Sequence, residues 1–275
     1  MPPWLWLCKM NFNREFENKS QPRHPVGLSS KAMTLNNWKG QKFARYLYDS
    51  EQTILQQATS QLAGYRLMHL GVAADQCGLQ GSKQLHQFYV RPSSEPLSFD
   101  GSYLVSDYAD LPLPSSVVEV AVLQHALEYS YSPQAVLAES ARVLAPGGHL
   151  ILCVINPLSP IGLMKLPMGL LSKRPEYHFS GLRKGRIKDW LSLLNFQIIQ
   201  IADGAYSWPL EQLASYKKDS LWERGCHKAH LPWGNFYMIQ AVKRVAGGVS
   251  NTPRPWKARV SGGYVSPSKK INLKE

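Results

Sequence analysis

Polar side chains that could do chemistry stand directly after apolar runs in the first half of the chain. Asp107 follows a run that begins at Leu104, and Gln124 and His125 lie at the end of a second run that begins at Val117. An imidazole in such a place is either a general base or a core histidine whose hydrogen bonds are satisfied. Aspartate is in addition a favoured turn residue. These residues favour a binding site, and none is singled out as catalytic.

A second group of residues has spacing that resembles a metal site. Cys226, His227 and His230 form a C-H-x-x-H sequence. Structural zinc sites need four ligands, and no second cluster accompanies these three. We therefore expect no bound metal. The four cysteines are scattered without a C-x-x-C pair, which argues against a disulfide framework and favours a cytoplasmic protein.

The segments that must position these residues succeed one another as in a parallel sheet. Between residues 104 and 156 there are two apolar runs, a helix-like segment (132–144), a Pro-Gly-Gly turn (146–148) and a third apolar run (149–156). Parallel strands need a crossover helix between them, so this order predicts strand, strand, helix, strand.

The flanking sequence extends the same pattern in both directions. Apolar residues at helical spacing predict a helix up to residue 64, with short strands after it at residues 66–71 and 85–90. A helix at 185–196 and strands at 196–206 and 235–244 follow the central block, while residues 156–180 read as an irregular Pro/Gly-punctuated loop. The sequence thus predicts an α/β fold with a doubly wound sheet of seven mostly parallel strands, the last of them antiparallel.

Length and composition set the domain boundaries. A chain of 275 residues accommodates one large α/β domain, which we place at residues 33–245. Residues 1–32 are predicted to be a disordered arm or a mis-assigned start, because Met33 opens a segment that reads as a domain start. Residues 246–275 are rich in Gly, Ser and Pro and carry six Lys or Arg against one acidic residue, so we expect a basic, flexible tail.

A net charge of +12 would attract phosphate groups such as those of nucleic acids, but a solvated basic surface is the simpler explanation. Much of it lies in the tail and in a cluster at residues 173–188, where a solvated surface accounts for it. We expect no nucleic-acid partner. No apolar run reaches the roughly 20 residues that span a bilayer, so no membrane span is expected either.

At its central motifs the chain resembles the class I S-adenosylmethionine-dependent methyltransferases, and among them the small bacterial YafS-like methyltransferase-domain proteins. The resemblance covers roughly residues 33–244. The residues that carry it are DYADLPL at 107–113, VEV at 118–120, RVLAPGG at 142–148, the loop at 155–163 and DWLSLLNF at 189–196. The resemblance implies a Rossmann-like fold and S-adenosyl-L-methionine as the cofactor.

The resemblance also implies which residues touch the cofactor, since this family binds it across the carboxyl ends of the first strands. The implied contacts, strand by strand, are Leu70, Gly71 and Ala73, then Asp107 and Tyr108, then Gln124 and His125. In this family the carboxylate matched by Asp107 accepts a hydrogen bond from the adenine amine. Glu119 matches an acidic position on the fourth strand and is expected to be structural.

Two landmarks of the family depart from the usual pattern in this chain. The turn HLGVAADQCG has Gly71, Ala73 and Asp75 where a full signature has three glycines. No acidic residue ends the second strand to bind the ribose hydroxyls, because Arg91 and Pro92 stand there and the nearest carboxylate is Glu95.

Two functions therefore stay open. The first is methyl transfer to a small-molecule acceptor, with residues 156–180 and 208–233 as a lid over it. The second is a catalytically inactive methyltransferase-like module that works through binding. A nicotinamide-dependent dehydrogenase is excluded, because the first turn lacks G-x-G-x-x-G. The acceptor and the oligomeric state are left open.

Overall fold

The computed structural model describes residues 42–71, 83–92, 101–171, 179–209, 225–226 and 231–244, with the backbone alone for 166–171. The predicted arm and tail lie outside the described residues, as do Ala73 and most of the 208–233 segment. No helix among the described residues is long and apolar enough to cross a membrane.

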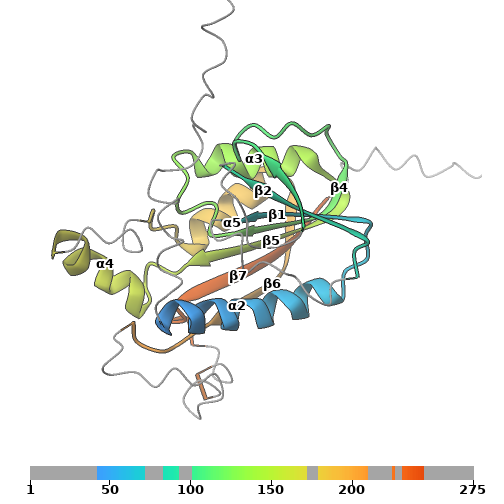
Figure 1. Ribbon diagram of the computed structural model, residues 1–275. Coiled ribbons are helices and arrows are strands. Elements are labelled where there is room, and N and C mark those ends of the chain that lie inside the picture. Colours follow the sequence, from blue (N-terminus) through green and yellow to red (C-terminus); the bar gives the residue numbers. More distant parts are fainter. Residues whose placement is uncertain are drawn as a thin grey trace, which may run out of the picture. The chain divides into compact units, whose positions relative to one another are not determined.

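Seven strands form one sheet in the order β3-β2-β1-β4-β5-β7-β6 (Figure 1). The first five are parallel to one another, and β7 runs antiparallel to both of its neighbours. The strands are β1 (Arg66–Gly71), β2 (His86–Arg91), β3 (Ser102–Val105), β4 (Val118–Gln124), β5 (Leu144–Ile155), β6 (Phe196–Gly204) and β7 (Phe236–Lys243). The predicted fold class is confirmed.

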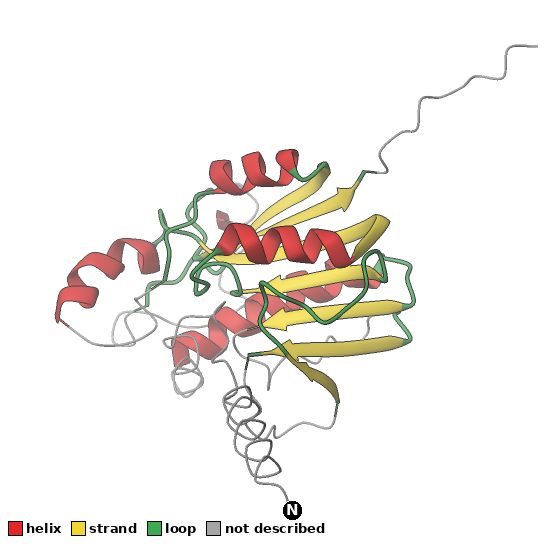
Figure 2. Cartoon of the chain, turned by 90° about the horizontal axis from the view of Figure 1, so that it is seen from above, coloured by secondary structure: helices red, strands yellow, loops and turns green. Residues whose placement is uncertain are grey.

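Helices cover both faces of the sheet. Helix α2 (Lys42–Ser60) lies against one face, and α3 (Pro133–Val143) and α5 (Lys184–Leu193) lie against the other (Figure 2). The alternation along β4 follows from this: Val120 and Val122 pack in the α2-side cluster, while Ala121 and Leu123 pack in the larger cluster with α3 and α5. Strands buried on both faces read as continuous apolar runs, which is why the sequence revealed them.

Two expectations about the segments beside the site were wrong. The 156–180 segment contains a helix, α4 (Pro160–Leu171), in place of an irregular loop. Pro160 opens this helix, because proline fits the first helical turn, where its missing N–H is not needed. Asp107 does not directly follow a strand, as its apolar run predicted. The third strand ends at Val105, so Asp107 lies two residues beyond it, in an isolated bridge with Asp110.

The Pro-Gly-Gly turn is part of β5. Val118 pairs with Leu144 and Val120 with His149, so the turn bulges out of the ladder opposite Glu119. Gly147 has φ +77°, a conformation that glycine adopts without steric cost. The bulge lets the strand begin directly after α3 and still enter the centre of the sheet.

Two glycines also permit a close contact between the end of β6 and the residues that precede β7. A Cβ atom on Gly234 would lie 2.7 Å from both the backbone N and O of Gly204, the last residue of β6. The two backbones thus approach each other at the point where the chain enters β7.

Candidate cofactor site

The carboxyl ends of the parallel strands meet at one edge of the sheet. Gly71 ends β1 and pairs with Gln124, which ends β4, and Arg91 ends β2 and pairs with Val105, which ends β3. Open α/β sheets bind their ligands outside this edge. The structure therefore brings together the predicted residues Gly71 and Gln124. The side chain of Leu70, one residue earlier, is buried in the core.

Tyr108 joins the ends of two strands through its hydroxyl. Its ring is fully buried, and its hydroxyl lies 2.8 Å from the carbonyl oxygen of Gly71 and 3.1 Å from that of Val90. The hydroxyl donates to these carbonyls at the ends of β1 and β2. Its side-chain oxygen thus faces the backbone, and it fixes where Gly71 lies.

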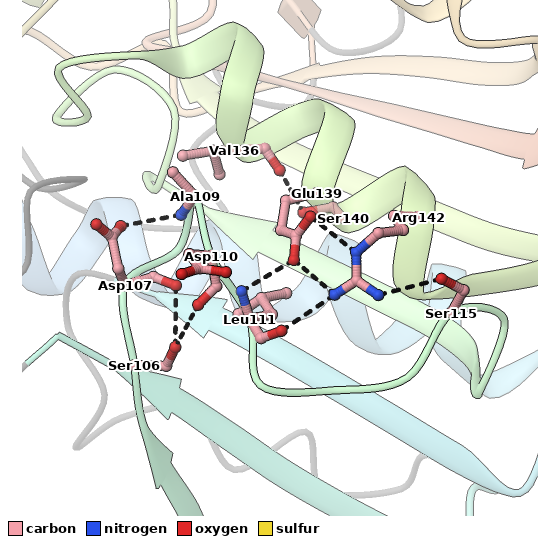
Figure 3. A network of polar contacts seen from close by, with 10 residues as sticks. All are labelled: Ser106, Asp107, Ala109, Asp110, Leu111, Ser115, Val136, Glu139, Ser140 and Arg142. Carbon is pink, nitrogen blue, oxygen red and sulfur yellow. Dashed lines mark hydrogen bonds and ion pairs between the residues drawn. The ribbon is translucent and has the colours of Figure 1, made fainter.

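Asp107 sits in a turn that it helps to build. Its Oδ1 accepts a hydrogen bond of 2.9 Å from the backbone N–H of Ala109, and Asp110 donates back to its carbonyl oxygen (Figure 3). This is an aspartate turn, the alternative role weighed from the sequence. Its other carboxylate oxygen has no hydrogen bond among the described residues, so the turn leaves one acceptor available.

The segment after β3 is anchored on α3 by one ion pair. The guanidinium of Arg142 binds both carboxylate oxygens of Glu139, the carbonyl oxygen of Leu111 and the hydroxyl of Ser115 (Figure 3). Glu139 in turn accepts the backbone N–H of Leu111 at 2.9 Å. The Arg142 hydrogen bond holds the pKa of the Glu139 carboxyl below its usual value. The network fixes the turn that carries Asp107.

His125 is held between two buried carboxylates. Its Nε2 lies 2.8 Å from Oε1 of Glu51 on α2, and its Nδ1 lies 2.6 Å from Oε1 of Glu128. His125 is 1% exposed and has φ +55°, an uncommon backbone conformation for a residue other than glycine. Since each ring nitrogen faces a carboxylate, both nitrogens carry a proton and donate.

The protonation of His125 decides between its two proposed roles. Burial by itself lowers the pKa of an imidazole, but the charges and hydrogen bonds of Glu51 and Glu128 outweigh burial and raise the pKa of His125 to about 10. A histidine that keeps both protons near neutral pH does not accept a third group's proton. The satisfied core histidine is thus the reading that the geometry supports.

His69, on the neighbouring strand β1, shows the opposite behaviour. Burial lowers the pKa of its imidazole to about 4, with the Gln124 side chain offsetting part of the effect. His69 is therefore neutral at physiological pH. β1 thus carries a neutral buried histidine, and the residue that follows β4 is a charged one.

Sequence reasoning missed Glu51 and Glu128. Glu51 occupies the position between Leu47 and Leu55 at four-residue spacing, on the apolar face of α2. A carboxylate in the middle of an apolar helix face is a signal of a buried partner. The partner lies 74 residues away in the chain, which no local pattern reveals. Glu119, by contrast, is structural as expected, since it accepts the backbone N–H of Arg66.

The two departures from the family pattern differ in what the structure shows. The turn after Gly71, with Ala73 and Asp75, lies outside the described residues. At the end of β2, Arg91 is buried, and its guanidinium lies 6.0 Å from the ring centroid of Tyr103. A cation therefore stands where the family has a carboxylate.

The three residues with metal-site spacing lie only partly within the described residues. Cys226 is a buried free thiol, and His227 and His230 are not described. Within the described ranges no three His, Cys, Asp or Glu side chains are grouped as metal ligands.

Comparison with known proteins agrees with this architecture. Residues 66–152 match the family model for a methyltransferase domain. The Escherichia coli K12 protein YafS is 30% identical over 140 residues, which cover 51% of this chain and 56% of YafS. A demethylmenaquinone methyltransferase of Chlamydia trachomatis is 30% identical over 154 residues, 54% of this chain and 57% of that protein. The chain spans little more than half the length of these curated relatives.

Solved structures share the fold at low sequence identity. A methyltransferase from Thermotoga maritima that depends on S-adenosylmethionine has a TM-score of 0.59 at 18% identity, over 77% of this chain and 95% of its own. One from Archaeoglobus fulgidus has a TM-score of 0.51 at 17% identity, over 70% and 92%. The chain therefore has the fold of these S-adenosylmethionine-dependent methyltransferases, and the segment from β1 into β5 is the part that matches the methyltransferase-domain model.

Proposed function

We propose that the protein transfers a methyl group from S-adenosyl-L-methionine to a small-molecule acceptor. The observation that supports this most is the joint position of Gly71 and Gln124 at one strand edge, with Tyr108 bound to Gly71 and Asp107 next to it. A glycine without a side chain permits close approach of a ligand to the backbone. The relatives named as methyltransferases support the same reaction.

The described residues fit the cofactor on the adenine side. Asp107 keeps one carboxylate oxygen without a hydrogen bond among the described residues, and we assign that oxygen to the adenine amine. Leu70, Gly71 and Gln124 are assigned to the methionine side, and so is Ala73, which lies outside the described residues. His125 and Tyr108 contribute the wall of the site, since their polar side-chain atoms already bind other protein groups.

Methyl transfer places modest demands on the protein. When bound, the sulfonium supplies a methyl group that is already activated for displacement. The chain has to orient the acceptor against it and to exclude water. His125 takes no proton from the acceptor, because both of its nitrogens already hold one. We infer that the acceptor attacks as a neutral nucleophile or loses its proton to another group.

The acceptor itself is assigned to the segment after β5. Helix α4 begins five residues beyond the end of that strand, on the carboxyl side of the sheet, and Leu158 and Leu163 are exposed there. The same side is where this fold binds ligands. A small acceptor with an apolar part fits these side chains best.

A second candidate, an inactive binding module, is favoured by one observation. Arg91 stands at the end of β2, where a carboxylate would bind the ribose hydroxyls, and it is buried there. If this difference and the altered turn after Gly71 abolish cofactor binding, the domain acts through binding a partner alone.

Titration calorimetry with S-adenosylmethionine separates the two candidates. We expect binding by the unmodified chain and an affinity at least about tenfold lower for Asp107→Ala, equivalent to loss of one charge-assisted hydrogen bond of about 1.4 kcal/mol. Asp110→Ala is the matched control, because it removes a carboxylate from the same turn, and it should bind normally. Absence of heat and of thermal stabilisation at millimolar cofactor would leave only the binding module.

A further inference from the structure

A buried carboxylate of α2 reaches the strand edge from outside the segment that matches the family model. Glu51 is 0% exposed, although charged side chains are rarely buried without partners. Its Oε2 accepts a hydrogen bond of 2.6 Å from the side-chain amide of Gln124, and its Oε1 binds Nε2 of His125 at 2.8 Å. One side chain thus holds two consecutive residues at the end of β4.

The opposite side of His125 is held in the same way. Glu128 binds Nδ1 of His125 at 2.6 Å and accepts the backbone N–H of Ile155, the last residue of β5, at 3.0 Å on the same oxygen. The backbone N–H of His125 donates to Cys153 at 2.9 Å. The cluster of Glu51, His125 and Glu128 therefore joins α2 to the ends of β4 and β5.

This cluster has a conformational task. With φ +55°, His125 turns the chain sharply where it leaves β4, and such a conformation persists only where the surroundings fix it. The two carboxylates and the Cys153 carbonyl accept three hydrogen bonds from this single residue. Gln124, which pairs with Gly71, is the residue immediately before the turn.

We propose that Glu51 is a positioning residue of the cofactor site, which fixes Gln124 and His125 in the arrangement that receives S-adenosylmethionine. The inference rests on the proposed function, since it assigns Glu51 a part in the same site. It goes beyond that function because α2 precedes the matched segment and Glu51 touches the site only through other residues. The cluster also explains how a domain with an altered first turn retains an ordered edge at β4.

The groups that face the cluster are few among the described residues. The ring of Tyr48 on α2 meets the ring of His125 edge-on at 6.1 Å. Burial raises the pKa of the Cys153 thiol on β5, and the charges of Glu51 and Glu128 raise it further. Burial likewise raises the pKa of Tyr237 on β7, where Glu128 is the one carboxylate of the cluster that adds to the effect. Neither supplies a positive charge. His125 is thus the cation that balances Glu51 in the described part of the chain.

The test compares Glu51→Gln with Asp49→Asn, which removes an exposed carboxylate from the same helix. Cofactor dissociation constants are measured by calorimetry on the full chain, well below the midpoint of unfolding of each variant. We expect Glu51→Gln to weaken binding about tenfold while its circular dichroism is unchanged. Asp49→Asn should bind as the unmodified chain does, and Glu51→Asp, which restores the charge, should recover part of the affinity. Equal affinity of Glu51→Gln and the unmodified chain would overturn the proposal.

A second readout needs no cofactor. Nitrogen chemical shifts of the His125 imidazole report whether both ring nitrogens are protonated at pH 8 in the unmodified chain. We expect two protonated nitrogens, and a lower titration midpoint in Glu51→Gln. A singly protonated ring at pH 8 would show that His125 does not donate to both carboxylates, and that the cluster does not hold it as proposed. If the cluster is present but neither the unmodified chain nor any variant binds S-adenosylmethionine, the proposed function fails, and the positioning role fails with it. If the unmodified chain binds the cofactor and Glu51→Gln binds it equally well, the positioning role alone is overturned.

Discussion

The hydroxyl of Tyr108 lies 2.8 Å from the carbonyl oxygen of Gly71, 37 residues earlier in the chain. The bond joins the end of β1 to the segment after β3, and β2 lies between these two strands in the sheet. It also reaches the carbonyl oxygen of Val90 at 3.1 Å. The glycine at the edge of the candidate site is thus held by a buried phenol.

Tyr108→Phe should loosen this edge without disrupting the core. The ring stays buried and two carbonyl groups lose a donor, so we expect the free energy of unfolding to fall by about 1 kcal/mol. Cofactor affinity should fall by a few fold, because Gly71 becomes less well fixed. Urea unfolding and calorimetry measure the two effects. Tyr103→Phe, at a tyrosine that is 54% exposed, is the control and should change neither.

His125→Asn should be strongly destabilising. Asparagine tolerates the left-handed backbone, but two buried carboxylates lose their cation, which costs about 3 kcal/mol or more. The folded-state pKa of His125 is raised to about 10 from 6.5, so its stabilising effect is complete below pH 6.5 and declines as the pH rises towards 10. The difference in unfolding free energy between the two proteins should therefore be largest near pH 6 and shrink in alkali. A difference that grows with pH would contradict the paired, protonated state.

Glu139→Gln should lower stability at neutral pH and hardly at all in acid. Its folded-state pKa is lowered by Arg142, so its contribution is present above the unfolded-state pKa and is lost as the pH falls through the folded-state value. Because the side chain of Arg142 is 37% exposed, solvent screens the pair, and we expect about 1 kcal/mol at pH 7. Thermal unfolding at pH 7 and below pH 4 checks this. Equal losses at both pH values would show that packing, not charge, explains the effect.

Gly234→Ala should be among the more damaging single changes in the domain. Its Cβ would lie 2.7 Å from backbone atoms of Gly204, which cannot yield as a side chain can, so we expect a loss of about 2 kcal/mol or more. Gly185→Ala is the contrasting variant, because no atom lies within 4 Å of its added Cβ in α5. That change should stabilise the protein by about 0.5 kcal/mol. Chemical denaturation of both variants gives the comparison.

Much of the fold could be predicted because its strands are buried on both faces. The runs at residues 66–71 and 149–156 match β1 and most of β5, and Ile187 and Leu191 of α5 are buried as the helical spacing predicts. Helix α4 was missed because its two prolines and two glycines resemble loop residues. Pro160, however, opens the helix, and its apolar residues carry no clear period.

The candidate site was less accessible to sequence reasoning. Gly71 and Gln124 are found at strand ends because such ends can be located from apolar runs, whereas Asp107 lies two residues beyond the end of β3. Their contacts to cofactor stay predictions. Glu51 could not be linked to His125 from the sequence, since the contact depends on how α2 crosses the sheet. The hydrogen bonds of the Tyr108 hydroxyl could not be predicted either. Its partners are backbone carbonyl oxygens, which every residue type carries.

The position of β7 has a consequence for how the chain assembles during synthesis. β7 is the last strand in the described chain, yet it lies between β5 and β6 and supplies the sole partner of β6 in the described sheet. Until residues 236–243 leave the ribosome, β5 keeps a bare edge and β6 cannot join the sheet. Such edges pair readily with other chains. The nascent domain is therefore most exposed to aggregation just before its final strand emerges, and a stalled or truncated chain would stay in that state.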